Sequence, residues 1–126
     1  RPMWLDAKTA TEIQNRLGAD IIMVFDECAR LPCPPEVVER AVQRSIRWAQ
    51  TCKEVHQRAD QSLFGIVQGG LDVGLRRHCA TALLEIGFDQ AKDMVRLAEE
   101  SGLCVEAIHP DIAGLARVVE ISSGDK

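Results

Sequence analysis

Two short apolar runs stand out along the chain, and each ends abruptly in polar residues. Both are rich in branched side chains, as is typical of strands that are buried on both faces in a parallel sheet. We therefore predict strands over 20–26 and 62–68. The first ends in Asp26-Glu27-Cys28 and the second in Gln68-Gly69-Gly70.

Around these strands, apolar residues recur at the spacing of amphipathic helices. Asp6 suits a helix N-cap, Pro35 suits a first helical turn, and Gly18 and Gly87 suit helix ends. Predicted helices cover 6–17, 35–58, 71–86 and 89–101, the last with Asp89 as its cap.

In the last quarter of the chain, the pattern of apolar and polar residues is less regular. We predict a short strand over 103–108 and a turn at His109-Pro110. The apolar stretch 112–121 is of uncertain type, and 122–126 is predicted to be a frayed tail.

The alternation of strands with helices predicts an α/β protein built from βαβ units around a parallel sheet. In such a sheet the carboxyl ends of both strands lie at one rim, where α/β proteins bind their ligands. The pattern by itself leaves open whether the sheet closes into a barrel or stays an open, doubly wound sheet.

The two carboxylates after the first strand cannot both enter one pocket, because neighbouring strand residues point to opposite faces. Asp26 has the parity of Ile22 and Val24, whereas Glu27 has the parity of Ile21 and Met23. A carboxylate such as Asp26 can accept two adjacent N–H donors from a flat ligand. The alternative is a solvated or helix-capping carboxylate at the strand end.

The second strand delivers Gln68, whose amide offers donors and an acceptor in one plane and so suits an amide-bearing heterocycle. Gly69 and Gly70 would let the backbone approach a ligand closely. The alternative is an ordinary polar strand end followed by a turn. Two strand ends with hydrogen-bonding side chains suggest one shared site.

Composition narrows the class of protein. The chain has 126 residues, of which 46% are hydrophobic and 27% charged, with a formal charge of −4. This charge gives no overall attraction to nucleic acid. No apolar run approaches the length of a membrane span, and we expect no signal peptide before the domain and no membrane association. Because the first residue is Arg1, we expect a piece of a longer protein.

The five cysteines are odd in number and scattered, which favours free thiols in a reducing cytoplasm. Cys28 and Cys33 have C-x4-C spacing, but prolines crowd the second, and Cys52 and His56 share only a helix face. Neither pair predicts a zinc site. We identify no metal ligands and no nucleophile with a paired base.

Three stretches together resemble one known family. They are TATEIQNRLGADIIMVFDEC (9–28), RSIRWAQTC (44–52) and LFGIVQGG (63–70). Over roughly residues 3 to 89 the chain resembles the central part of the tRNA-guanine transglycosylases. The resemblance implies a (β/α)8 barrel with a zinc subdomain. It also implies exchange of guanine at the tRNA wobble position for a 7-deazaguanine, the queuosine precursor.

Residue by residue, the resemblance implies four base-binding positions. Asp26 matches the aspartate that binds the guanine-like base through its amidine edge. Gln68 matches the glutamine that binds the same base, and Gly69 lies beside it. Cys28 matches the pocket cysteine of the FDEC motif.

Other parts of the family's pattern find no match. The DSGGFQ motif would precede Arg1, and the nucleophilic aspartate and the zinc ligands would follow residue 89. We therefore divide the chain into a partial, incomplete barrel over 1–89 and a divergent α/β tail over 90–126. The expectation is no catalytic residue and no cofactor in this chain, which alone would be inactive.

The alternative function is a non-catalytic α/β module that binds a small ligand or a partner subunit. The expected partners of the family-like protein are tRNA and guanine or a 7-deazaguanine. An incomplete barrel also leaves strand edges exposed, which predicts homo-oligomerisation or recruitment of the missing barrel portion.

Overall fold

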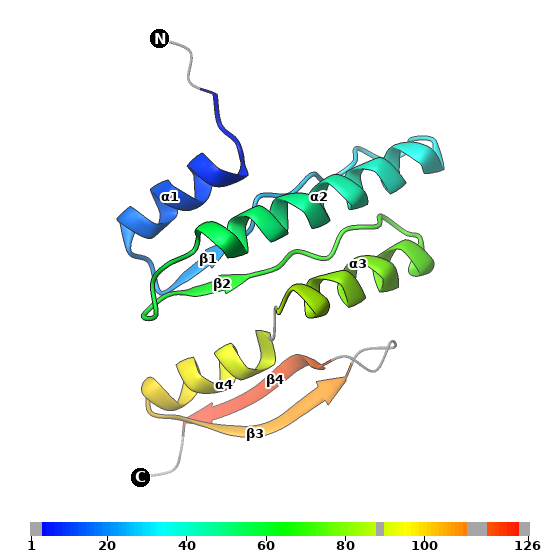
Figure 1. Cartoon of the computed structure of the whole chain (residues 1–126). Helices are drawn as coiled ribbons and strands as arrows, with labels where there is room; N and C mark the ends of the chain where they lie inside the picture. The colour runs from blue at the N-terminus through cyan, green and yellow to red at the C-terminus, as the bar shows by residue number, and fades with distance from the viewer. Residues whose placement is uncertain (1–3, 88–89, 111–115, 124–126) are drawn as a thin grey trace. The chain divides into compact units, whose positions relative to one another are not determined.

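The computed structural model describes residues 4–87, 90–110 and 116–123, and the chain divides into two compact units, 1–88 and 89–126 (Figure 1). The described elements are mixed helix and strand, so the prediction of an α/β protein is confirmed. In chain order they are α1 (Ala7–Leu17), β1 (Ile21–Met23), α2 (Pro35–Val55), β2 (Ser62–Phe64), α3 (Val73–Ile86), α4 (Gln90–Glu100), β3 (Leu103–Pro110) and β4 (Ala116–Ser123).

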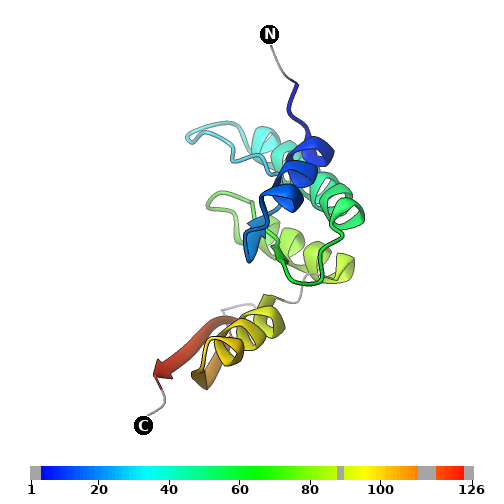
Figure 2. The same cartoon turned by 90° about the vertical axis from the view of Figure 1, so that its left-hand side faces the viewer.

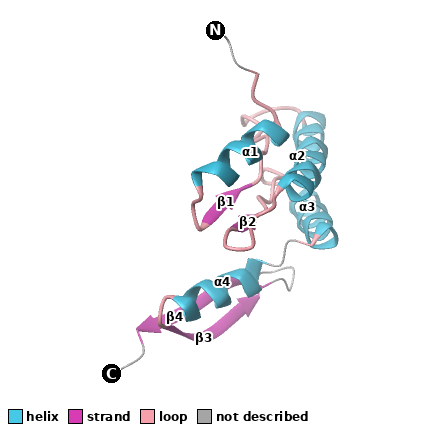
Figure 3. Cartoon of the chain, turned by 60° about the vertical axis from the view of Figure 1, so that its left-hand side comes forward, coloured by secondary structure: helices cyan, strands magenta, loops and turns pink. Residues whose placement is uncertain are grey.

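In the first unit, β1 and β2 pair in parallel, with Ile22 opposite Leu63. Helix α2 connects them, and it packs against both α1 and α3 (Figure 3). The predicted parallel βαβ arrangement is therefore confirmed for this strand pair. Because the strands run in parallel, the loops that follow them project on the same side of the unit (Figure 2).

The helix ends follow from local chemistry. The Asp6 carboxylate accepts the Thr9 N–H at 2.8 Å as the N-cap of α1, and this bond holds the pKa of Asp6 below its ordinary value of 3.8. Gly18 and Gly87 end α1 and α3 at φ +71° and +95°, angles that favour glycine. Helix α3 begins at Val73 rather than at 71, because Asp72 supplies its N-cap.

Helix α2 begins at Pro35, as predicted, but ends at Val55 rather than at 58. Its last turn is limited by His56, whose backbone is extended at φ −66° and ψ 124°. Arg58 then bonds the side chain of Asp60 in the following turn. The apolar periodicity therefore predicted a C-terminal end for α2 that is about one turn too late.

The core lies on one face of β1 only. Ile22 and Val24 are each 4% exposed, whereas Ile21 is 44% and Met23 42% exposed. The prediction that this strand is buried on both faces is therefore wrong. The side chains that pack around the buried face are mainly apolar helix residues: Ala7, Val42, Ala49, Cys52, Leu63, Cys79 and Leu83.

Both strands are shorter than predicted. The ladder covers only Ile21–Met23 and Ser62–Phe64 rather than 20–26 and 62–68. A strand needs a hydrogen-bonded partner along its whole length, and the backbones of the two segments part after Phe64. Asp26 and Gln68 consequently lie in the loops beyond the strands.

The outer edge of β1 is covered by a side chain. The Gln14 amide donates to the Met23 carbonyl at 3.0 Å and accepts the Met23 N–H at 3.3 Å. One glutamine thus takes both backbone groups of a strand residue, as a neighbouring strand would.

The second unit contains α4 and an antiparallel pair, β3 and β4. Strand β3 extends through His109 and Pro110, so the prediction of a turn there is wrong. The uncertain stretch 112–121 contains the start of β4, which continues through Ser122 and Ser123. These two residues pair with Cys104 and Leu103 and are not frayed, because the partner strand satisfies their backbone. The predicted cap Asp89 lies outside the described residues.

Along the described parts of the chain, no helix combines the length and the apolar character that crossing a bilayer requires.

Candidate functional site

The ends of the two parallel strands converge on one side-chain pair. The Gln68 amide nitrogen Nε2 donates to Asp26 Oδ2 at 2.6 Å, across 42 residues of sequence. Both residues are half-buried. The two strand ends therefore bring these side chains together, as the sequence predicts, and their binding of a ligand stays a prediction.

Glu27 contacts other partners than this pair, in agreement with the prediction that the two carboxylates do not enter one pocket. Its carboxylate accepts a 2.6 Å bond from Arg44 of α2, and its N–H donates to Ser45 Oγ at 2.9 Å. Arg44 in turn lies over the Trp48 ring, 5.8 Å from its centroid. Glu27 is therefore committed to α2, which leaves Asp26 as the carboxylate of the site.

Two buried thiols hold the backbone at the same rim. Cys52 Sγ of α2 accepts the Phe25 N–H at 3.4 Å, and Cys79 Sγ of α3 accepts the Gln68 N–H at 3.4 Å. Both cysteines are 0% exposed. Both thiols are free, as the sequence predicts, and their hydrogen bonds place them next to the site.

Gly69 is fixed by packing. Its φ is +141°, and a Cβ built there would lie 2.6 Å from the Arg76 backbone nitrogen of α3. Gly70, at φ +54°, lies near the side chains of Leu31 and Val38. The close approach that the sequence suggested at Gly69 is thus an approach to α3 in this structure.

Cys28 is exposed on the loop after β1, two residues beyond Asp26, and Cys33 is half-buried on the same loop. Within the described ranges, no group of three or more His, Cys, Asp or Glu side chains could hold a metal ion.

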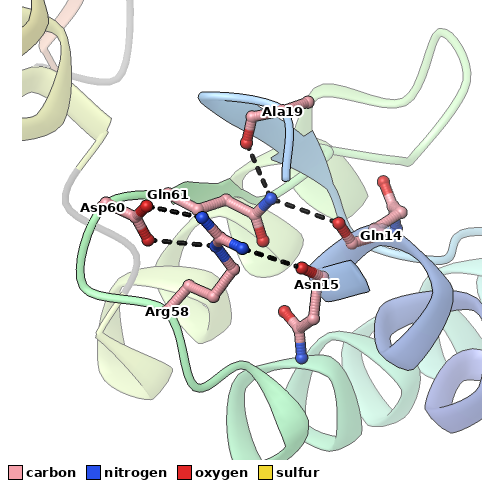
Figure 4. A network of polar contacts seen from close by, with 6 residues as sticks. All are labelled: Gln14, Asn15, Ala19, Arg58, Asp60 and Gln61. Carbon is pink, nitrogen blue, oxygen red and sulfur yellow. Dashed lines mark hydrogen bonds and ion pairs between the residues drawn. The ribbon is translucent and has the colours of Figure 1, made fainter. Parts of the chain in front are cut away.

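A separate polar network lies at the amino ends of the strands (Figure 4). The buried Gln61 amide donates to the carbonyls of Ala19 at 2.7 Å and Gln14 at 3.2 Å. Arg58 binds both Asp60 oxygens and the Asn15 carbonyl. The bond from Arg58 lowers the pKa of Asp60 below 3.8 and raises the pKa of Arg58.

The chemistry available at the carboxyl rim is recognition of a planar, polar ligand. Asp26 has two acceptor oxygens, and the Gln68 amide has a second N–H and a carbonyl oxygen beyond the donor that it uses here. Because these groups lie on the loops that follow two adjacent parallel strands and already meet at 2.6 Å, one flat ligand could engage both. The first unit is therefore an α/β module with its candidate site at the carboxyl ends of parallel strands.

Comparison with known proteins defines the family. A sequence model described as "TGT: Queuine tRNA-ribosyltransferase" matches residues 1–115. The chain belongs to this family.

Individual relatives agree with this assignment. The queuine tRNA-ribosyltransferase of Halothermothrix orenii is 48% identical over 85 residues, 68% of this chain and 23% of the relative. That of Gloeobacter violaceus is 56% identical over 75 residues, 60% of this chain and 20% of the relative. That of Geobacillus thermodenitrificans is 49% identical over 87 residues, 68% and 23% of the two chains. The match thus spans less than a quarter of these relatives.

Sequence reasoning missed the hydrogen bonds of Cys52 and Cys79. In the sequence, Cys52 only continues the apolar stripe of its helix, and its spacing to His56 suggests a metal pair at most. One sequence signal could have pointed to them. Each of the two helices that follow a site strand carries a cysteine on its buried face, and a thiol there can fill apolar space and still accept a weak hydrogen bond.

Proposed function

We propose that this chain contributes the base-recognition part of a queuine tRNA-ribosyltransferase, with Asp26 and Gln68 binding guanine or a 7-deazaguanine. The observation that carries the proposal is the 2.6 Å bond that joins Asp26 to Gln68 at the ends of adjacent parallel strands. In the whole protein, these strands would belong to a (β/α)8 barrel. Family membership over residues 1–115 supports both statements.

The geometry suits a guanine-like base for a simple reason. Guanine presents two neighbouring N–H donors on one edge, and a carboxylate accepts such a pair side by side. An adjacent carbonyl on the base can accept the second N–H of Gln68. The existing Gln68–Asp26 bond orients both side chains before the ligand arrives, which reduces the entropy cost of binding.

Cys28 and Gly69 are the two further base-binding positions of the proposal. Cys28 lies on the exposed loop beyond Asp26, within reach of a ligand that approaches from solvent. Gly69 follows Gln68 directly, and its packing against Arg76 fixes the path of the backbone there.

The activity of the whole protein would be exchange of the wobble guanine of tRNA in the cytoplasm. Zinc, which the resemblance implies for the family, has no fitting ligand set among the described residues, so it enters no step of the proposal. We assign no nucleophile in this chain and expect no base exchange by the chain alone. Its partners would be tRNA and, by strand pairing, a second copy or the missing barrel portion.

Guanine titration followed by calorimetry tests the proposal. Replacing Asp26 by Ala removes charge-assisted hydrogen bonds of about 1.5–3 kcal/mol each, so affinity should fall at least about tenfold. Glu27→Ala is the matched control, because the neighbouring carboxylate is bonded to Arg44 and should change affinity less than about twofold. Equal affinities for wild type and Asp26→Ala would refute the assignment. Absence of binding by the wild-type chain would favour the non-catalytic module.

A further inference from the structure

The parallel ladder between β1 and β2 ends before the site begins. The paired residues end at Met23 and Phe64, and the Val24 N–H donates to the Phe64 carbonyl at 2.9 Å. Phe25, Asp26 and Gln68 lie past this pairing and are half-buried, so their backbone donors favour partners within the protein. The positions of Asp26 and Gln68 therefore depend on what satisfies the backbone just past the ladder.

The partners come from the two helices that follow the strands. Cys52, on α2, reaches back 27 residues to the N–H of Phe25, immediately before Asp26. Cys79, on α3, reaches back 11 residues to the N–H of Gln68 itself. Each thiol also has a carbonyl within range of its S–H: Ala7 at 3.7 Å for Cys52 and Ile66 at 3.9 Å for Cys79.

We propose that Cys52 and Cys79 are a pair of positioning residues, whose thiols hold the backbones of the Asp26 and Gln68 loops so that the two side chains meet. The effect of the two thiols on ligand binding rests on the proposed function, whereas their effect on the two loops does not. The same arrangement occurs twice. In each case a strand leads into a loop, and a backbone N–H of that loop donates to a buried thiol on the helix that follows, once beside Asp26 and once at Gln68. Both thiols act through the backbone and need not touch the ligand.

A thiol suits this task physically. Sulfur is a weak acceptor but a good apolar filler, so it can occupy a fully buried position and still receive one N–H. Alanine or valine at either position would leave the loop donor without its partner, and a buried donor without a partner favours a shifted loop. Serine would retain an acceptor, with a shorter reach, and so is the conservative replacement.

The test uses the full chain labelled with ¹⁵N and four variants: Cys79→Ala, Cys79→Val, Cys79→Ser and the control Cys104→Ala. Cys104 is exposed on β3, in the other unit. Amide hydrogen exchange is measured at Gln68 and, as a reference for global opening, at the buried Val42 of α2. Guanine affinity is measured on the same samples. The equivalent Cys52 variants are read at Phe25.

The expected result is selective. Gln68 exchange should accelerate at least about tenfold relative to Val42 in the Ala and Val variants, as loss of the partner of a buried donor predicts, and should accelerate less in Ser than in Ala. Guanine affinity should fall about three- to tenfold in Ala and Val, fall less in Ser, and change less than about twofold in Cys104→Ala. If the Ala variant accelerates exchange at all amides together, it has lost global stability. The Val and Ser variants, which fill more of the space of the thiol, then show whether Gln68 is affected selectively.

Two results would overturn the proposal. One is unchanged relative exchange at Gln68 in both Ala and Val, which would mean that the thiol does not hold this amide. The other is selective loss of protection with unchanged guanine affinity, which would mean that the bond does not position the site. A wild-type chain that does not bind guanine refutes the proposed function, while the exchange measurements still decide whether the thiols hold the two loops.

Discussion

The two ends of the β1–β2 pair satisfy their backbone groups with different chemistry. At the amino end, the polar side chains of Gln61 and Arg58 donate to backbone carbonyls of α1 and of the turn before β1. At the carboxyl end, the backbone N–H groups donate to the thiols of Cys52 and Cys79.

The difference explains where a ligand can bind. At the amino end, Gln61 donates only to backbone carbonyls, and Arg58 donates to the Asn15 carbonyl as well as to the Asp60 side chain. At the carboxyl end, by contrast, the Asp26 and Gln68 side chains bond to each other. Because no backbone group depends on this bond, the remaining donor and acceptor groups of Asp26 and Gln68 can bind a ligand without breaking the fold. The amino end should therefore govern stability and the carboxyl end recognition. Three substitutions can break or sharpen this division.

The largest expected effect is an exception to the division, at Gly69 of the carboxyl end. Gly69→Ala places a Cβ 2.6 Å from the Arg76 nitrogen at φ +141°. Backbone strain and overpacking together should lower the free energy of unfolding by roughly 2–5 kcal/mol. Urea unfolding measures this.

Gly74→Ala is the matched control for that substitution. Gly74 lies in α3, and a Cβ added there would meet only the Asp72 side chain, at 3.1 Å. The Asp72 oxygen that it would meet caps the helix by accepting the Leu75 N–H, so this oxygen must shift by a few tenths of an ångström, while alanine favours the helix. The two effects oppose each other, and the unfolding free energy should change by no more than about 1 kcal/mol. A tolerated Gly69→Ala would show that α3 can move away from the site loop.

The second effect tests the amino end. Gln61→Met keeps the length of the side chain but removes both donors, which leaves the carbonyls of Gln14 and Ala19 without this partner. The unfolding free energy should fall by about 1–3 kcal/mol, with guanine affinity unchanged within about twofold. Gln57→Met, at an exposed glutamine in the same loop, should change stability by less than about 0.5 kcal/mol. A loss of affinity in Gln61→Met would show that the two ends are coupled.

How far the sequence predicts this structure depends on how local each feature is. The ends of α1 and the start of α2 follow from Asp6, Gly18 and Pro35, which act within one helical turn. The length and burial of β1 do not follow from nearby residues, because both depend on which other elements pair with the strand and cover it. An apolar run such as 21–25 predicts a strand, but not its neighbours.

The candidate site divides in the same way. Asp26 and Gln68 could be predicted because strand ends in parallel sheets meet at one rim, whatever the number of strands. The hydrogen bonds of Cys52 and Cys79 span 27 and 11 residues and leave no periodic signal, so only the position of each cysteine on a buried helix face points to them. For Gly69 the sequence predicted that other atoms approach the backbone closely. It could not predict that these atoms belong to Arg76, because that depends on how α3 packs.

The smallest effect concerns the Arg58–Asp60 pair at the amino end. Asp60 is paired to Arg58 at 2.5 Å but its side chain is 69% exposed, so water and salt screen the interaction. The bond nevertheless lowers the pKa of Asp60 below its ordinary value of 3.8. A group whose pKa is lower in the folded state stabilises the fold above its unfolded pKa, and this contribution is lost as the pH falls through its folded pKa.

Asp60→Asn should therefore lower stability by a small amount at pH 5 to 7, and the difference from wild type should shrink as the pH falls below about 3.8. Urea unfolding of both proteins over pH 2.5 to 7, at low and high salt, measures it. The low pKa of Asp6 acts in the same range in both proteins and cancels in the difference. Glu39→Gln, at an exposed carboxylate of α2, controls for the change in net charge. A difference that stays constant with pH would mean that Arg58 holds the turn through the Asn15 carbonyl alone, with the ion pair contributing nothing to the amino end.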